Sequence, residues 1–299
     1  MGRLAYVNGR YMPHAHAQVH IEDRGYQFAD GVYEVVPVVD GVLIDENPHL
    51  DRLGYSLAEL KIAWPVARPV LRLILRELMA RNRLRRGIIY FQVTRGVAPR
   101  DHKFPAQAKS SLVITTKRLK PPAPSLFSEG VAVSIQPDIR WARRDIKSLS
   151  LLPNVLAKQA AVQAGAYEAW LVEEVSGIVT EGSSTNAWIV THSGEIATYP
   201  RGHDILGGIT RETLLDLAEA QGLAVVERAF TRDEALAATE AFLTSSSAFI
   251  VPVTRIDGQV IGSGKPGPVT ERLRELYLAH VARQVALGQI GANATAARP

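Results

Sequence analysis

The chain has 299 residues, 46% of them hydrophobic, which is enough apolar material for two packed domains or one large one. It contains no cysteine, so disulfides, thiolate catalysis and zinc sites built on cysteine are excluded, and a reducing cytosol is compatible with it. The formal net charge of +4 is mild and does not by itself indicate a nucleic-acid partner.

The beginning of the chain, MGRLAYVNGR, shows no apolar run after its charges, and no stretch approaches the ~20 apolar residues of a membrane span. We therefore expect a cytoplasmic protein. His14, His16 and His20 alternate, but a polar strand or turn explains them, and we expect no metal site.

The first 120 residues mix strand and helix patterns. Asn8-Gly9 in an alternating stretch predicts an opening hairpin, and Asn47-Pro48 predicts a helix N-terminus before a stripe of leucines. Strands are expected at 32–39, 42–44, 87–94 and 111–116, and a second helix at 69–84. This pattern predicts an α+β layer and not a parallel doubly wound unit.

The Pro-rich stretch KRLKPPAPSLFSEG breaks all periodicity and predicts a domain boundary. We place a small N-terminal domain at 1–120, a linker at 121–130, a larger C-terminal domain at 131–290 and a loose tail at 291–299.

The second domain is expected to begin with a strand at 131–136 and to continue with a helix at 153–165 and strands at 169–173, 178–181, 186–190 and 241–253. Serines 245–247 interrupt the last of these strands. Thr210 is expected to N-cap a helix through Gln221, and Thr231 with Glu234 forms a capping box. The final helix is expected at 269–287.

Lys147 lies at the centre of the segment DIRWARRDIKSLSLL. Burial and neighbouring positive charge disfavour an ammonium, so a lysine in this setting can supply a neutral amine for carbonyl addition. A solvated lysine at a strand end explains the pattern equally well. Lys158, on the following helix, is the main competitor, but its neighbours one turn away are mostly Ala and Gln.

Five stretches occur in one order along the chain: EDRGYQFADGVYEVV, YFQVTRG, DIRWARRDIKSLSLL, TEGSSTN and GGITR. Together they resemble the D-amino acid aminotransferases of the fold-type IV (class IV) pyridoxal-phosphate family, over almost the whole chain. The resemblance implies a small N-terminal α/β sandwich, a larger C-terminal pseudo-barrel and pyridoxal 5'-phosphate as cofactor. It also implies that Lys147 carries the cofactor as a Schiff base.

The same resemblance assigns the other cofactor contacts. Glu181 is expected to pair with the pyridine nitrogen and keep it protonated, with Ser183, Ser184 and Thr185 as nearby donors. The phosphate is expected at the start of the helix that follows Gly207-Gly208, because a helix N-terminus favours anions. Its expected contacts are Arg52, Ile209, Thr210, Ser246 and Ser247. The sequence departs from the family at Ala248-Phe249, where a small polar residue and an acid are common.

Arg100 and His102 are two residues apart, so an extended loop would point both side chains the same way. With Tyr33 they resemble the trap that binds the α-carboxylate of D-amino acids and 2-oxo acids. In the family the Arg-x-His pair comes from the neighbouring subunit, which implies a homodimer. The implied reaction is ping-pong transamination between a D-amino acid such as D-alanine and a 2-oxo acid such as 2-oxoglutarate or pyruvate.

Other activities share the lysine, the glutamate and the phosphate cradle. A branched-chain L-amino acid aminotransferase, an aminodeoxychorismate lyase and an (R)-amine transaminase of the same fold are the alternatives, and the set Tyr33, Arg100 and His102 favours the D-specific enzyme. A cofactor-free protein whose helix N-terminus binds another anion is an alternative from a different class. A P-loop or dinucleotide-binding enzyme is not indicated, because neither glycine pattern follows a strand.

Overall fold

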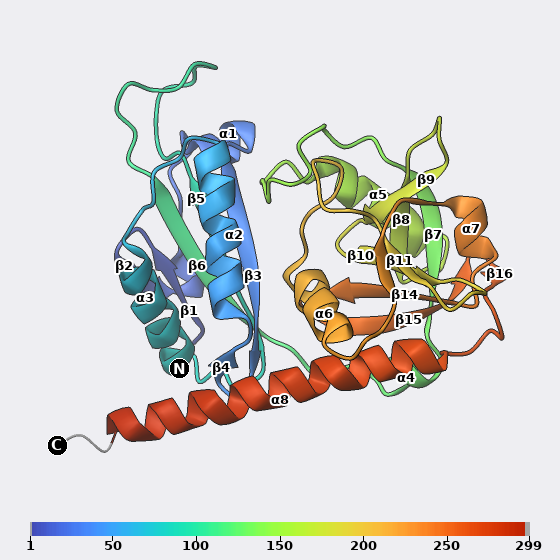
Figure 1. Ribbon diagram of the computed structural model, residues 1–299. Helices are drawn as coiled ribbons and strands as arrows, with labels where there is room; N and C mark the ends of the chain where they lie inside the picture. The colour runs from blue at the N-terminus through green and yellow to red at the C-terminus, as the bar shows by residue number, and fades with distance from the viewer. Residues whose placement is uncertain (1, 297–299) are drawn as a thin grey trace. The chain divides into compact units, whose positions relative to one another are not determined.

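The computed structural model describes the backbone of residues 2–296 and the side chains up to Ile290. Its contacts divide the chain into two compact units, both drawn in Figure 1. Among the described residues, the first unit comprises 2–120, 146–150 and 281–296, and the second comprises 121–145 and 151–280. The short segment that carries Lys147 thus belongs to the first unit, although its flanking residues belong to the second.

The first unit is built on a six-stranded sheet with the order β2-β1-β6-β5-β3-β4. Every neighbouring pair in this sheet is antiparallel, which confirms the predicted α+β layer. The elements of this unit that precede the boundary are β1 (Leu4–Val7), β2 (Arg10–Pro13), η1 (His14–His16), α1 (Arg24–Phe28), β3 (Gly31–Val39), β4 (Val42–Leu43), α2 (Glu46–Glu59), α3 (Arg68–Arg81), β5 (Gly87–Thr94) and β6 (Ser111–Arg118).

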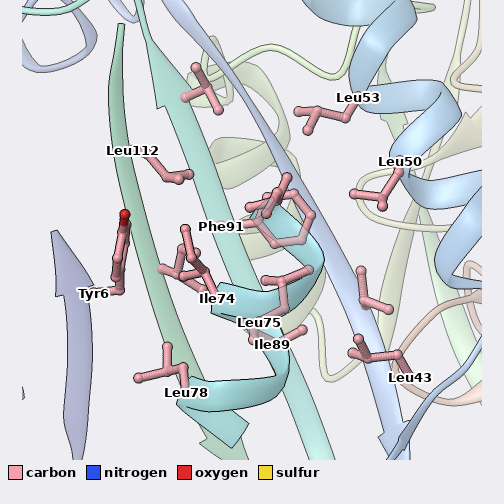
Figure 2. Packing of buried hydrophobic residues seen from close by; sticks show 14 of the residues in the cluster. Tyr6, Leu43, Leu50, Leu53, Ile74, Leu75, Leu78, Ile89, Phe91 and Leu112 are labelled. Atoms are coloured by element: carbon pink, nitrogen blue, oxygen red, sulfur yellow. The ribbon is translucent and has the colours of Figure 1, made fainter. Parts of the chain in front are cut away.

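Helices α2 and α3 supply the apolar residues that pack on one face of this sheet. Leu50 and Leu53 of α2 and Leu75 of α3 are fully buried, and they belong to the same cluster as Ile89 and Phe91 of β5 (Figure 2). The leucine stripe that predicted α2 is therefore the stripe that is buried. Alternate residues of β3 and β5 point to the opposite, partly exposed face, which carries Tyr33.

The start of α2 differs from the prediction. The helix begins at Glu46 after Asp45, whose backbone is left-handed with φ of 54°, so Asn47 is inside the first turn and does not cap it. Asp45 is held by Gln284 of the last helix, which accepts from the Asp45 N–H at 2.9 Å and donates to the Asp45 carboxylate at 2.5 Å. A contact between residues 239 positions apart fixes this helix end, and local sequence does not show it.

The second unit contains a ten-stranded sheet with the path β12-β11-β10-β14-β15-β7-β8-β9-β13, and β16 pairs with β15. It is mixed: β7 pairs in parallel with β8 and β15, whereas β8–β9, β10–β14 and β14–β15 are antiparallel. Its strands are β7 (Val131–Pro137), β8 (Glu168–Val172), β9 (Ile178–Gly182), β10 (Asn186–Val190), β11 (Ile196–Thr198), β12 (Val225–Glu227), β13 (Phe230–Thr231), β14 (Glu240–Ser245), β15 (Phe249–Ile256) and β16 (Gln259–Val260).

The helices that begin in this unit are α4 (Ser125–Ser128), α5 (Leu152–Gln163), α6 (Ile209–Glu219), α7 (Arg232–Leu236) and α8 (Pro268–Ala296). The capping box of α7 is confirmed, since Thr231 accepts from the Glu234 N–H and Glu234 accepts from the Thr231 N–H. The predicted N-cap of α6 is wrong: Gly208 occupies that position, and Thr210 is already helical.

Helix α8 continues through residues 291–296, where the composition predicts a loose tail. Residues 297–299 of that predicted tail lie outside the described part of the chain. Over the described residues, none of the helices combines the length and the apolar character that crossing a membrane requires.

One buried charge cluster joins β3 to α2. Glu34 is fully buried on the helix-facing side of β3, where it accepts from Arg52 Nε and Nη2, both at 2.8 Å, and pairs with His49 Nδ1 at 2.7 Å. Burial would raise the pKa of Glu34, but the charge and hydrogen bonds of Arg52 outweigh it and lower the pKa to about 2. Burial lowers the pKa of His49, so the neutral ring donates to Glu34 at neutral pH. The two hydrogen bonds between Arg52 and Glu34 fix the plane of the Arg52 guanidinium.

We expect this cluster to make the protein acid-sensitive. The pKa of Glu34 lies at about 2 in the folded state against an ordinary value of 4.5, so its contribution is complete above pH 4.5 and is lost as the pH falls towards 2. The shift corresponds to about 3 kcal/mol of the free energy of unfolding. His49 adds to the loss below its ordinary pKa of 6.5, because the unfolded chain takes up the proton more readily.

Urea unfolding of wild type and Glu34→Gln between pH 7 and pH 3 measures how the free energy of unfolding depends on pH. The variant should be less stable at pH 7, because Arg52 loses its charged partner, and its stability should fall less steeply below pH 4.5. The control is Glu77→Gln, which removes an exposed carboxylate paired with Arg81 on α3. Equal acid slopes for wild type and Glu34→Gln would show that another group carries the effect.

Candidate active site

Lys147 lies on an extended segment that runs beside the beginning of β3. Its carbonyl accepts from the Tyr33 N–H at 3.0 Å, and its own N–H donates to Ser56 Oγ at 3.2 Å. The Leu149 N–H donates to the Gly31 carbonyl at 3.0 Å, and a Cβ at Gly31 would come within 2.8 Å of the Leu149 side chain. The backbone on both sides of the lysine is therefore fixed against β3.

The side chain of Lys147 lies over an aromatic ring of the same unit. Its Nζ is 4.4 Å from the centroid of the Tyr33 ring, and that ring is 5.7 Å from the ring of Tyr90 on β5. The Tyr90 hydroxyl donates to Gln92 at 2.7 Å, and burial raises the pKa of Tyr90 to about 12. The structure thus brings together two predicted site residues, Lys147 and Tyr33, which are 114 positions apart in the sequence.

Arg100 and His102 lie on the exposed loop between β5 and β6. Both contact the ring of Phe28, the last residue of α1: the Arg100 guanidinium carbon is 4.6 Å from its centroid, and the His102 ring is 5.4 Å away. The two side chains therefore share one aromatic neighbour. Tyr33, the third predicted trap residue, has Lys147 and Tyr90 as its ring neighbours.

In the second unit, Glu181 is buried at the end of β9 and is surrounded by donors. Its carboxylate accepts from Arg140 Nη1, from Asn186 Nδ2 at 3.0 Å and from the Leu206 N–H at 3.1 Å. Arg140 in turn makes a two-pronged pair with Asp138, with N–O distances of 2.9 and 2.8 Å. Asp138 also accepts from Thr180 Oγ1 at 2.7 Å, so the whole group is hydrogen-bonded.

The charges of this group depend on one another. Burial raises the pKa of Glu181, and the charge and hydrogen bonds of Arg140 act in the opposite direction. Burial would lower the pKa of Arg140, but the carboxylates of Glu181 and Asp138 outweigh it and raise the pKa. Because all the partners of Glu181 are donors, they stabilise its ionised form. A buried carboxylate held in this way can accept a hydrogen bond from a protonated ring nitrogen.

Asn186 connects Glu181 to the start of α6. Its Nδ2 donates both to Glu181 and to the Leu206 carbonyl, while its Oδ1 lies so close to Gly208 that a Cβ there would be 2.0 Å away. Gly208 is therefore required for the tight approach of the helix start to Asn186. Ile209 and Thr210, both buried, form the first helical positions. The first N–H groups of an α-helix have no partner inside it and favour an anion.

The serines of the predicted site lie in two turns of the second unit. Ser183 and Ser184 both donate to the fully buried carboxylate of Glu168 on β8, at 2.7 Å for Ser184. Ser246 and Ser247 occupy the turn between β14 and β15. Phe249, the departure from the family pattern, begins β15 with φ of 62° and packs against the ring of Tyr277 at 5.0 Å.

Several charged or polar residues around Arg52 in the first unit, and around Glu181 and the serines in the second, were not assigned a role from the sequence. They are Glu34, His49, Asp138, Arg140, Glu168 and Asn186. Two signals could have found some of them: Glu34 takes a core-facing position of an apolar strand, and Asn186 closes the quoted TEGSSTN motif. The role of Arg140 has no such signal, because several arginines surround Lys147 and only the fold selects the one that meets Glu181.

Comparison with known proteins identifies the family of this chain. Residues 31–256 match the family model described as amino-transferase class IV. A D-alanine aminotransferase of Bacillus licheniformis is 45% identical over 267 residues, covering 89% of this chain and 93% of the relative. One from Listeria innocua is 40% identical, covering 93% and 96%.

Solved structures show the same fold. A branched-chain amino acid aminotransferase of Escherichia coli superposes with a TM-score of 0.86 at 23% identity, over 93% of this chain and 94% of the other. A branched-chain enzyme of T.th., solved with pyridoxamine 5'-phosphate, gives 0.85 at 27% identity over 93% of both chains. The predicted two-domain fold of the fold-type IV enzymes is confirmed, and the chain belongs to the amino-transferase class IV family.

Proposed function

We propose that this protein is a pyridoxal-phosphate-dependent D-amino acid aminotransferase, which exchanges the amino group between a D-amino acid such as D-alanine and a 2-oxo acid such as 2-oxoglutarate or pyruvate. The observation that carries this proposal is the 45% identity, over almost the whole chain, to a D-alanine aminotransferase. The branched-chain enzymes match at 23–27% identity, which supports the shared fold more than a shared substrate. We also propose a cytoplasmic location, which the absence of cysteine supports.

The residues present fit the proposed coenzyme. Glu181 offers a buried carboxylate among donors for the ring nitrogen, and the start of α6, held against Asn186 through Gly208, offers backbone N–H groups for the phosphate. Arg52 would add charge to the phosphate, with Glu34 fixing the plane of its guanidinium. Ser183, Ser246 and Ser247 would complete the contacts from their turns.

When bound, the coenzyme supplies an aldehyde for an amine and a ring that withdraws electrons from the substrate α-carbon. Lys147 Nζ would hold the coenzyme and would remove the proton from the substrate α-carbon. Glu181, which accepts hydrogen bonds from Arg140 and Asn186, would hold the proton at the ring nitrogen. The second substrate, a 2-oxo acid, follows the same steps in reverse.

Arg100 and His102 would bind the substrate α-carboxylate, and Tyr33 would donate its hydroxyl to it. A guanidinium matches a carboxylate with two parallel hydrogen bonds, so it fixes orientation as well as charge. Orientation of the carboxylate decides which face of the α-carbon presents its hydrogen to Lys147. This is why the trap favours one enantiomer.

The substrate prediction concerns the stereochemistry of the donor. With 2-oxoglutarate as acceptor, D-alanine should be turned over at least about 100-fold more efficiently than L-leucine or a simple (R)-amine, because only D-alanine meets the carboxylate trap in a productive orientation. The measurement is kcat/KM for the three donors with the same purified enzyme. Preference for L-leucine would instead assign the branched-chain activity, and preference for the amine an (R)-amine transaminase.

Lys147→Ala should lose the visible absorption of the covalently bound coenzyme and about 10³-fold or more of the turnover, because both attachment and proton transfer use this amine. Borohydride reduction followed by peptide mass analysis should place the coenzyme on Lys147 in the wild type. Lys158→Ala is the matched control, since Lys158 contacts Glu168 and Tyr167. Coenzyme found on Lys158, or wild-type turnover in Lys147→Ala, would refute the assignment.

We further propose that two copies of the chain form the active enzyme, each supplying Arg100 and His102 to the other. Helix α5 supports this, because its small Ala157 and Ala161 are buried while Leu152, Val155 and Leu156 are 55–69% exposed. A helix that keeps its larger apolar side chains outward is typical of an interface. The exposure of Arg100 and His102 within one chain agrees with a role in a partner's site.

Mixing two inactive variants tests the shared site. Arg100→Ala and Lys147→Ala chains should each be nearly inactive alone. After mixing and re-equilibration, activity should return to about one quarter of the wild-type value at most, because half of the random dimers are mixed and each has one site with both residues intact. The measurement is D-alanine turnover together with the mass in solution, expected at twice the 32.6 kDa of the chain.

Val155→Glu with Leu156→Glu in both chains should prevent this recovery by placing charge on the apolar face of α5. Val175→Glu is the control, because Val175 is 94% exposed in the turn before β9. An active monomeric wild type, or a mixture that stays inactive although mixed dimers form, would show that Arg100 does not act in the site of a partner chain.

A further inference from the structure

The segment before β3, EDRGYQFAD, has no role in the function proposed so far, yet many contacts hold it in place. It forms α1, whose N-cap Asp23 accepts from the Gly25 N–H at 2.8 Å and from Thr94 Oγ1 at 3.0 Å. The Arg24 N–H donates to the Gly96 carbonyl at 2.9 Å. A Cβ at Gly25 would be 2.3 Å from the side chain of Thr94. Only glycine at this position therefore lets α1 pack so closely against the end of β5.

Arg24 connects this helix to the loop that carries Arg100 and His102. It is only 3% exposed, and its Nε donates to Asp30 at 2.7 Å. Its Nη1 donates to the Asp101 carbonyl at 2.6 Å, and its Nη2 is 3.5 Å from the His102 carbonyl. A buried guanidinium therefore holds the backbone of the Arg-Asp-His tripeptide, and a lysine could not reproduce this fork.

Asp30 completes the anchor. It accepts from Arg24 and also makes a two-pronged pair with Arg95, at 2.8 and 3.0 Å, at the point where the loop leaves β5. Burial would raise the pKa of Asp30, but the two arginines outweigh it and lower the pKa, so this carboxyl stays ionised. The anchor is thus a buried ion-pair cluster that ties α1 to the beginning of the loop.

Phe28 contacts the side chains of the tripeptide. The guanidinium carbons of Arg24 and Arg100 lie 4.8 and 4.6 Å from its ring centroid, and the His102 ring lies 5.4 Å away at 48°. Arg100 and His102 are exposed in the chain, and a free arginine side chain loses rotamer entropy worth up to about 2 kcal/mol when a ligand orders it. A ring that already orders both side chains reduces that loss on binding.

We propose that Arg24 and Phe28 are positioning residues for substrate-carboxylate recognition: Arg24 fixes the backbone of the Arg100–His102 tripeptide, and Phe28 orders its two side chains before a substrate arrives. The inference rests on the proposed function, since it assigns these residues to the carboxylate trap. In this proposal α1 supports the substrate site through the Arg100–His102 tripeptide and does not itself contact the substrate.

The test uses the ring of Phe28, because Phe28→Leu leaves the hydrogen bonds and ion pairs of Arg24 in place. In the holoenzyme, Phe28→Leu should raise KM about five- to tenfold for both D-alanine and 2-oxoglutarate, the range expected for losing a cation–π contact. Both substrates are affected because both carry the α-carboxylate. kcat should change less than twofold, and the visible spectrum and affinity of the coenzyme should stay as in wild type.

Phe28→Tyr is the matched variant, since it keeps the aromatic face and should restore KM to near the wild-type value. Arg24→Lys should raise KM in the same way as Phe28→Leu. A melting curve for each variant identifies any loss of fold. If Arg24→Lys unfolds, the comparison of Phe28→Leu with Phe28→Tyr still tests the proposed positioning role.

A background without the trap separates positioning from a general structural effect. In Arg100→Ala/His102→Ala, adding Phe28→Leu should not further change the D-alanine concentration that gives half-maximal single-turnover rate, measured from the coenzyme absorbance. The inference is overturned if Phe28→Leu leaves KM unchanged in the otherwise wild-type enzyme, or if it raises the half-saturating D-alanine concentration of single turnover equally in both backgrounds. Failure of the proposed function looks different, because the unaltered enzyme would then not turn over D-alanine.

Discussion

The arrangement of the second unit depends on one buried ion pair, between Arg140 and Glu181. A carboxylate removed from water at the end of a strand is unstable unless charge and hydrogen bonds replace the solvent. Arg140 provides the charge, and Asn186 and the Leu206 N–H provide the remaining donors. Asn186 also lies against Gly208, so the carboxylate and the start of α6 are fixed relative to each other by one side chain.

The first unit uses the same device in a different place. Glu34 is buried beneath the sheet and holds Arg52 in a two-pronged pair, while Asp30 holds Arg24 and Arg95. In each case a carboxylate shielded from most of the solvent holds a guanidinium, and this fixes the plane in which the guanidinium donates its other hydrogen bonds. The family resemblance points to Arg52 and to the loop after Arg95, and the structure shows which acids orient them. The proposed binding of a phosphate and a carboxylate would need such oriented cations.

Much of the architecture follows from the sequence alone, and so does the family. Strands β5 and β10 were predicted with their observed bounds, Gly87–Thr94 and Asn186–Val190, because each is a β-branched or aromatic run with a clear break at its end. The motifs also led to the proposal of Lys147 and Glu181 as site residues, and 45% identity to a D-alanine aminotransferase agrees with the family that those motifs predict. Local pattern was sufficient for the hydrophobic periodicity of these strands and for the capping box of α7, but it placed the N-cap of α6 at Thr210 instead of Gly208.

Contacts between distant parts of the chain were decided only by the tertiary structure. The start of α2 is set by Gln284, 239 residues away, and the lysine segment belongs to the first unit because Lys147 and Leu149 hydrogen-bond beside β3. The choice of Arg140 as the partner of Glu181, and of Phe28 as the ring beneath Arg100 and His102, likewise depends on which side chains the fold brings within hydrogen-bond or ring-contact distance. Sequence patterns record burial and local propensity, whereas the pairing of charges is a property of three-dimensional proximity.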